Sequence, residues 1–168
     1  MSVALTVRSV SPQAASGSAL SAYLRGVRRM FLNGTAMSGQ PDHHAVTGAR
    51  FLGGTRTAPL YRFYAVRDAF PGLYPIPPGS GLVGASIEGE LYELPEEMLY
   101  DSLMPEEPAE LELGVIELAD GTVVNAMHLQ FERLAPQDHV VDIAGLGGWR
   151  AYQDFLADQQ RLAAALQR

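Results

Sequence analysis

The segment Arg29–Gly39 (RMFLNGTAMSG) constrains the fold more than any other part of the chain. An apolar run, Met30–Leu32, ends abruptly at Asn33-Gly34 and is followed by small residues and a second glycine. This pattern predicts a buried strand that stops at a turn, where glycine allows positive φ and close approach of a ligand to the backbone. Backbone N–H groups in such a turn can bind a carboxylate or another anion. A plain strand and turn without a ligand is the alternative that residue chemistry leaves open.

The composition removes several classes of chemistry. All 12 basic residues are arginine, and the chain has neither lysine nor cysteine. These absences exclude lysine Schiff bases, P-loop lysines, thiol catalysis, disulfides and thiolate metal sites. The net charge of −7 argues against a protein that binds the nucleic-acid backbone, which needs a basic face. No stretch is apolar enough to span a membrane, and the first residues make a poor signal peptide, so a cytoplasmic protein is expected.

The chain, 168 residues long, is expected to form one domain over 29–168, preceded by an extension over 1–28. A short strand at 3–7 and a weak helical stripe at 18–27 are predicted within the extension. In the domain, alternating aromatic and β-branched residues predict strands at 49–52, 60–66 and 83–94. Asp120-Gly121 predicts a tight hairpin between 111–118 and 122–131, because Asp-Gly supplies the positive φ that such turns need.

Helices are predicted in three places, over 40–46, 95–103 and 149–167. The last of them carries an apolar stripe that begins at Trp149, and this stripe is expected to form a core face. Prolines and glycines predict irregular structure over 70–84, and a rigid acidic connector over 104–108. The stretch 135–144 is also expected to be irregular. No internal repeat or low-complexity tract is present.

Metal and cofactor chemistry have no support in the residue pattern. His43 and His44 are adjacent, so their side chains point apart, and no HExxH or facial carboxylate spacing occurs. The sequence also lacks a nucleophile elbow and a GxGxxG fingerprint. We therefore expect neither a metal nor a cofactor.

Glutamates are the remaining candidates for proton transfer, since a desolvated glutamate has a raised pKa and can act as base and then as acid near neutral pH. Two of them share one face of the strand predicted at 83–94, roughly 7 Å apart. Solvated glutamates on a half-exposed strand are the alternative for this pair. The candidates are Glu88, Glu90, Glu106 and Glu107.

The order of motifs resembles the γ-glutamylcyclotransferase-like (AIG2-like) fold. Residues 32–39 are similar to the Y-G-[ST]-L-x-x-G loop of that family, with Asn33 in place of tyrosine and Ala36 in place of leucine. Residues 89–94 (GELYEL) are similar to its G-E-[LV]-Y-x-[LV] strand.

Cyclotransferases of this family carry a catalytic glutamate just after the following helix, in a D-x-x-E-G context. An ungapped count along the chain places this glutamate at Glu106. Leu103 stands at the aspartate position of that motif and Glu107 at the glycine position. The resemblance therefore implies Glu106 as a catalytic residue, on a motif that is only partly matched.

A closer similarity is to the C-terminal domain of allophanate hydrolases, a branch of the same fold. Four segments carry it across about residues 30–153: 34–44, 56–66 (RTAPLYRFYAV), 111–121 (LELGVIELADG) and 142–152 (DIAGLGGWRAY). The last is the most specific, against D-I-T-x-F-G-G-W-R-A-Y. In the first, Ala36 stands where that family has the histidine of G-A-H, and His44 matches the later histidine. Nothing matches the amidase domain of those enzymes, whose Ser–Ser–Lys machinery needs a lysine.

The resemblance implies an α+β fold, with a small mixed β-barrel, a few flanking helices and a pocket rimmed by the glycine loop. The leading hypothesis is a stand-alone domain that acts on or binds a small carboxylate, ureido or γ-glutamyl-type compound. Glu106 or Glu90 would transfer a proton. The predicted ligand-binding residues are Asn33, Gly34, Thr35, Ala36, Met37, His44 and Tyr61. The alternative is a non-catalytic module that assembles with an amidase, an allophanate hydrolase or a second copy of itself.

Overall fold

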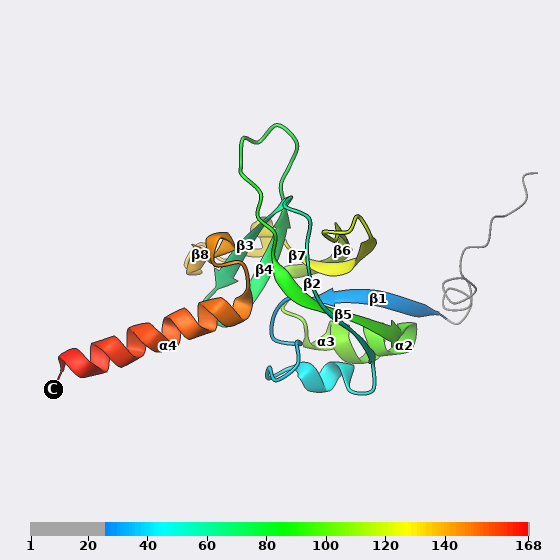
Figure 1. Cartoon of the computed structure of the whole chain (residues 1–168), viewed down its shortest axis with the longest axis horizontal. Coiled ribbons are helices and arrows are strands. Elements are labelled where there is room, and N and C mark those ends of the chain that lie inside the picture. The colour runs from blue at the N-terminus through cyan, green and yellow to red at the C-terminus, as the bar shows by residue number, and fades with distance from the viewer. Residues whose placement is uncertain (1–25, 168) are drawn as a thin grey trace, which may run out of the picture.

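The computed structural model describes residues 26–167 (Figure 1). The strand and helix predicted at 3–7 and 18–27 fall almost entirely outside the described residues. Within the described part, no helix is both long enough and apolar enough to cross a membrane.

One mixed sheet organises the domain. Its strands follow the order β2-β5-β1-β7-β4-β3-β8, and β6 pairs with β7 outside this path. The predicted α+β class is confirmed, because the sheet curls into a half-barrel that few helices flank. The strands are β1 (Val27–Leu32), β2 (Arg50–Arg56), β3 (Tyr61–Val66), β4 (Phe70–Pro75), β5 (Glu88–Pro95), β6 (Leu111–Glu117), β7 (Val123–Leu129) and β8 (Val140–Asp142).

Strand β1 lies in the interior of the sheet, as the apolar run at its end predicts. It pairs antiparallel with β5 over its whole length and parallel with β7 at Met30. Met30, Phe31 and Leu32 are all buried, so both faces of the strand end are covered. Because both edges of β1 are occupied, the loop that follows Leu32 starts from a fixed position.

The helical stretch after β5 is longer than predicted. It runs without a break through α2 (Glu96–Met98), the π-helix η2 (Leu99–Leu103) and α3 (Met104–Glu106). The Met104 N–H donates to the Leu99 carbonyl, an i→i−5 bond, just before Pro105, which has no N–H of its own. The expected connector over 104–108 is therefore wrong in its first half, which is the last helical turn.

Two stretches that were expected to be irregular contain strands. Phe70–Pro75 forms β4, which pairs antiparallel with β3 despite its two prolines and its glycine. The hairpin closes through Arg67 and Asp68, which both have positive φ, a geometry that aspartate tolerates but that arginine does not signal. Val140–Asp142 forms β8 at the edge of the sheet, against β3.

The remaining helices are short, apart from the last one. Two are 3₁₀ turns after β1 and β7, η1 (His43–Val46) and η3 (Phe131–Arg133), and a third, η4 (Ala144–Leu146), precedes α4 (Trp149–Leu166). The predicted hairpin at Asp120-Gly121 is confirmed by the β6–β7 pairing.

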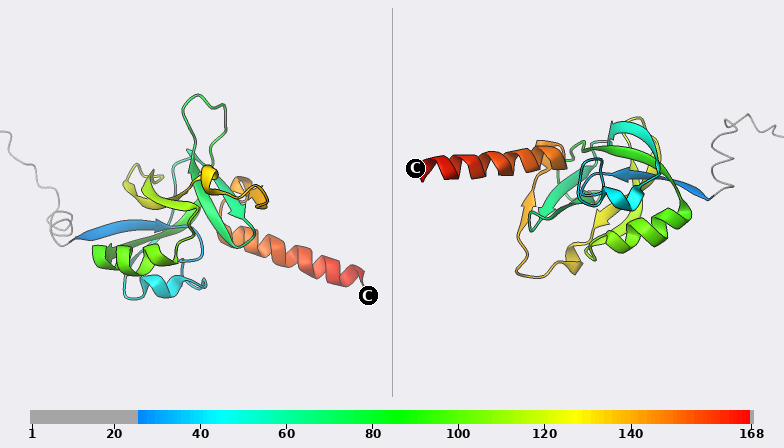
Figure 2. Two further views of the ribbon diagram at one scale, coloured as in Figure 1. Left: turned by 180° about the vertical axis from the view of Figure 1, so that it is seen from behind. Right: turned by 90° about the horizontal axis from the view of Figure 1, so that it is seen from below.

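Helix α4 projects away from the sheet in every view (Figures 1 and 2). Trp149 and Tyr152 are its buried residues, whereas Phe155, Leu162 and Leu166 are exposed. The apolar stripe forms a core face at Trp149, Tyr152 and the half-buried Leu156, and the expectation is wrong for Phe155, Leu162 and Leu166. A 3.6-residue stripe predicts an apolar face but not what covers it.

Candidate functional site

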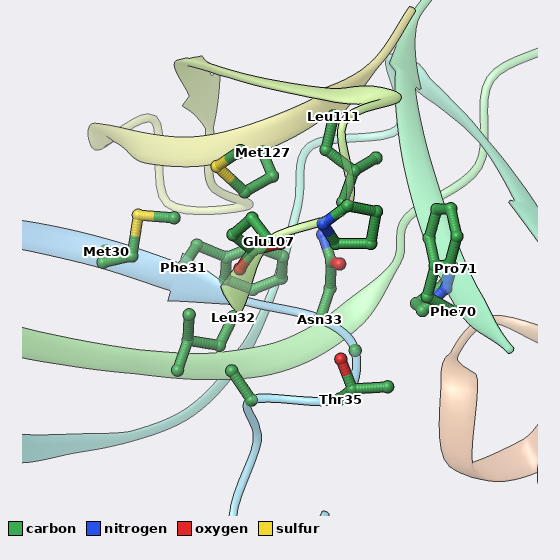
Figure 3. A pocket seen from close by; sticks show the side chains of 13 residues that line it. Met30, Phe31, Leu32, Asn33, Thr35, Phe70, Pro71, Glu107, Leu111 and Met127 are labelled. Atoms are coloured by element: carbon green, nitrogen blue, oxygen red, sulfur yellow. The ribbon is translucent and has the colours of Figure 1, made fainter. Parts of the chain in front are cut away.

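A small cavity lies where β1 ends (Figure 3). Its volume is about 20 Å³, which is room for about one water molecule. The wall combines the end of β1 and its loop with residues from β4, the segment after α3, β6 and β7. The lining residues are Met30, Phe31, Leu32, Asn33, Gly34, Thr35, Ala36, Phe70, Pro71, Glu107, Pro108, Leu111 and Met127.

The loop is held against β4 by close contact at Gly34. A Cβ at this position would lie 2.7 Å from Cγ of Pro71, so a larger residue would force the loop or the Pro71 ring to move. The loop also closes on itself, since the Met37 N–H donates to the Gly34 carbonyl at 3.1 Å and the Asp42 N–H to the Thr35 carbonyl at 2.8 Å. The loop is therefore both close-packed and internally bonded.

Several polar groups of the loop have no partner within residues 26–167. Nδ2 of Asn33 is buried and makes no hydrogen bond there. The backbone N–H groups of Thr35 and Ala36 also lack acceptors, although their carbonyls accept from Asp42 N and His43 Nδ1. A buried donor without an acceptor is costly, so Asn33 Nδ2 marks a place where a ligand oxygen or a water would be stabilised.

Glu107 is the acidic residue of the cavity, directly after α3 (Figure 3). Burial, with a further contribution from the negative charge of Asp42, raises the pKa of Glu107 to about 7. No hydrogen-bond donor or cation faces its carboxyl among the described residues. This carboxyl can therefore hold or release a proton near neutral pH.

Glu106, which the motif count selects, is exposed and does not line the cavity. It precedes Glu107 on the last turn of α3. In the π-turn each backbone N–H bonds to the carbonyl five residues earlier, where a regular α-helix uses four. One extra residue is thereby accommodated in the turn, and the side chains that follow are rotated about the helix axis by about one residue. The adjacent candidate, Glu107, leaves the helix in an extended conformation and lines the cavity beside the glycine loop.

Glu90, the other predicted catalytic residue, is buried on β5 and does not line this cavity. Its carboxylate accepts hydrogen bonds from the Ser38 N–H at 2.7 Å, the Ser38 hydroxyl at 2.5 Å, Arg150 Nη2 at 2.8 Å and the Tyr92 hydroxyl at 2.9 Å. Burial alone would raise the pKa of Glu90, but these donors outweigh it and lower the pKa to about 2. The carboxylate stays ionised at neutral pH and ties the loop to α4.

The other predicted ligand-binding residues are divided by the structure. Asn33, Gly34, Thr35 and Ala36 line the cavity. Three others do not: the Met37 side chain is buried with Sδ 3.6 Å from Arg150 Nη1, His44 is exposed, and the Tyr61 hydroxyl accepts the Glu117 N–H at 2.7 Å. Glu88 is exposed and forms an ion pair with Arg56. Within residues 26–167, no group of three or more potential ligands could hold a metal ion.

The model of the allophanate hydrolase C-terminal domain family matches residues 28–154. The chain belongs to this family. The predicted resemblance to the allophanate hydrolase C-terminal domain, and with it the γ-glutamylcyclotransferase-like fold, is confirmed. A search of curated proteins returned no match.

Solved structures share this fold over most of the chain. A protein specific to uropathogenic E. coli is 29% identical with a TM-score of 0.67, covering 76% of this chain and 96% of that one. Kluyveromyces lactis allophanate hydrolase is 24% identical with a TM-score of 0.68, covering 77% of this chain and 21% of that one. K. lactis urea amidolyase gives the same identity and TM-score, but only 8% of that chain is covered. The chain thus spans about a fifth of the allophanate hydrolase.

Sequence reasoning missed the residues that fix the site from a distance. Ser38 and Arg150 both bond Glu90, and Asp42 faces Glu107. All three lie in segments that match the family, Ser38 and Asp42 in 34–44 and Arg150 in the more specific 142–152. No local pattern could show that this arginine reaches β5.

Proposed function

We propose that the cavity binds the carboxylate or amide head of a small compound, of the short carboxylate, ureido or γ-glutamyl type, and that Glu107 exchanges a proton with it. The observation that carries the proposal is a half-buried carboxyl that lines the cavity, with its pKa raised to about 7, together with the buried and unpartnered Asn33 Nδ2. Asn33 Nδ2 and the N–H groups of Thr35 and Ala36 are the proposed donors to the ligand oxygens.

The protonation state of Glu107 would control binding. Below its pKa the neutral carboxyl can donate a hydrogen bond to a ligand carboxylate, whereas above it two negative charges face each other. In this conformation the cavity admits a group of about one water, so a complete ligand would require the loop or Glu107 to move. The need for that movement lowers the apparent affinity.

The test compares Glu107→Gln with Glu106→Gln, an adjacent glutamate that is exposed. Acetate, malonate and ureidoacetate serve as binding probes in 1H–15N NMR titrations, and γ-glutamylalanine serves as a turnover probe. We expect perturbations at 33–36 that weaken above pH 7 in the wild type but not in Glu107→Gln, whose amide is always neutral. Any turnover should fall about 10²–10⁴-fold in Glu107→Gln and stay unchanged in Glu106→Gln.

If turnover fell in Glu106→Gln and not in Glu107→Gln, Glu106 would be the catalytic residue. NMR perturbations confined to residues outside 33–36 would show that the probes do not bind in the cavity. Glu90→Gln is a poorer probe of catalysis because the same side chain holds the loop in place.

A second candidate function is assembly with an amidase, in an expected cytoplasmic setting. It is favoured by Ala36, which offers no side-chain catalyst where the family motif has histidine, and by relatives in which this domain is part of a larger amide-cleaving enzyme. An assembly module would co-purify with amidase activity on allophanate, and Glu107→Gln would leave that co-purification intact. A loss of co-purification in this variant would instead link the cavity to assembly.

A further inference from the structure

A second and much larger cavity lies between η1 and the strands β2 and β5. Its volume is about 480 Å³, which is the size of a site for a small organic molecule. It shares no lining residue with the cavity beside Glu107. Among the residues that line it are Ser38, His43, Thr47, Ala49, Phe51 and Tyr92.

Aromatic rings form one wall of this second cavity. Phe51 of β2 pairs with Tyr92 of β5, and their ring centroids are 5.2 Å apart at an angle of 51°. The imidazole of His43 lies 6.0 Å from the Tyr92 ring and is tilted by 56°. Tyr92 is buried, whereas Phe51 is 55% exposed. A flat ring that enters the cavity would cover Phe51 and meet these rings at the tilted or offset angles that aromatic pairs prefer.

Several donors in the cavity wall are already engaged within the protein. The N–H and hydroxyl of Ser38 and the hydroxyl of Tyr92 all donate to Glu90. The N–H groups of Thr47 and Ala49 donate to backbone carbonyls of η1. Among the described residues, no arginine and no carboxylate lines the cavity. An ionic ligand would therefore lose its hydration without gaining a partner of opposite charge, which favours a neutral one.

His43 supplies a hydrogen-bond acceptor to the same cavity. Its Nδ1 lies 3.0 Å from the carbonyl oxygen of Ala36, and because a carbonyl can only accept, Nδ1 carries the proton. In the neutral imidazole the other nitrogen, Nε2, is then an acceptor. Nε2 makes no hydrogen bond within residues 26–167. A ligand that uses this acceptor has to bring its own donor.

We propose that this second cavity binds a small, neutral aromatic compound that carries a ring N–H or O–H. The ring of the compound packs against Phe51 and Tyr92, and its donor bonds to Nε2 of His43. For a compound of about nine heavy atoms, we expect a dissociation constant of about 0.1–5 mM.

Indole is the probe, and benzofuran, which has the same shape with oxygen in place of the N–H, is its matched comparison. In 1H–15N NMR titrations to about 2 mM, indole should perturb amides within residues 46–51 and bind about three- to tenfold tighter than benzofuran. His43→Phe keeps a ring but removes the acceptor, so the two probes should then bind equally. A purely structural role of His43 would leave the ratio of the two affinities unchanged.

The contribution of the rings is measured with two variants. Phe51→Ala should weaken indole binding about fivefold, whereas Phe155→Ala, which removes a similarly exposed ring on α4, should leave it unchanged. Circular dichroism verifies that both variants are folded, which is expected because both side chains are about half exposed.

Four results would overturn the proposal. They are equal affinity of the wild type for indole and benzofuran, perturbations confined to residues that do not line the cavity, equal weakening by Phe51→Ala and Phe155→Ala, and tighter binding of tetramethylammonium than of indole. The last would show that the rings bind a cation.

Discussion

Two glutamates flank the glycine loop, the buried Glu90 and the half-buried Glu107, and their pKa values are shifted in opposite directions. Glu90 accepts four hydrogen bonds, from Ser38, Tyr92 and Arg150, and these lower its pKa to about 2 in spite of burial. Glu107 has no such donors, and burial with Asp42 nearby raises its pKa to about 7. The glutamate side chain is thus a permanent anion at Glu90 and an acid that titrates near neutral pH at Glu107.

The difference shows that burial alone does not decide whether a carboxyl group is ionised at neutral pH. Donors that converge on the charged form offset the loss of hydration at Glu90, and their absence leaves the neutral form favoured at Glu107. A fixed anion suits a structural role, because it holds its partners over the whole physiological pH range. A group that titrates near pH 7 suits proton transfer.

The largest expected effect comes from removal of the charge at the fixed site. Glu90→Gln should lower the free energy of unfolding by about 2–4 kcal/mol, because Arg150 and the Ser38 donors lose a buried anionic acceptor. Urea denaturation measures the loss. Glu93→Gln is the control on the same strand, and its exposed arginine partners predict a loss of less than about 1 kcal/mol. Equal losses of unfolding free energy in the two variants would show that the buried bonds of Glu90 stabilise the protein no more than the exposed ion pairs of Glu93.

The pH dependence of stability should separate the two glutamates. The folded pKa of Glu107 lies above its unfolded value, so the folded state binds more protons, and the free energy of unfolding should fall as pH rises from about 4.5 to 7. The change is at most about 3 kcal/mol. For Glu90, with a lowered pKa, stability is instead lost as pH falls below about 4.5 toward 2.

Glu107→Gln should remove the fall in the free energy of unfolding between about pH 4.5 and 7. The loss of stability below about pH 4.5, which is assigned to Glu90, should remain. Urea denaturation at a series of pH values in both proteins checks this. A wild-type decline that persists in the variant would assign it to other groups.

A smaller effect is expected from the loss of one donor to Glu90. Tyr92→Phe deletes the 2.9 Å bond from the tyrosine hydroxyl and should cost about 1 kcal/mol, with an upward shift in the pKa of Glu90. Thermal unfolding and carbon-13 NMR titration measure the two quantities. Tyr100→Phe, at a tyrosine that is 52% exposed, is the matched control and should be neutral. An unchanged Glu90 pKa in Tyr92→Phe would argue against the role of this donor.

The smallest effect concerns the neighbour of Glu107. Asp42→Asn removes a nearby negative charge and should lower the pKa of Glu107 slightly, because burial is the larger cause of the shift. Carbon-13 NMR titration of the Glu107 carboxyl detects it. Asp101→Asn, at an exposed residue of η2, should leave that pKa in place. A fall of the Glu107 pKa to its ordinary range in Asp42→Asn would make charge, and not burial, the dominant cause.

Local signals predicted those parts of the fold that local forces shape. The run Met30–Leu32 before Asn33-Gly34 predicted β1 and the loop after it. Asp120-Gly121 predicted the β6–β7 hairpin. Strand β4 was missed because its prolines and glycine suggest a loop, whereas pairing with β3 and β7 holds it in the sheet. The exposure of α4 was missed because periodicity describes one face of a helix and not its surroundings.

Sequence alone determined the family, the glycine loop and the small set of glutamates from which any acid or base had to come. It could not decide between them. Two of the three residues that donate to Glu90, Ser38 and Arg150, lie 52 and 60 residues away, and Glu107 lines the cavity whereas the adjacent Glu106 does not. Only the tertiary structure brings these groups together, and ionisation depends on which donors and charges converge on a carboxyl in space.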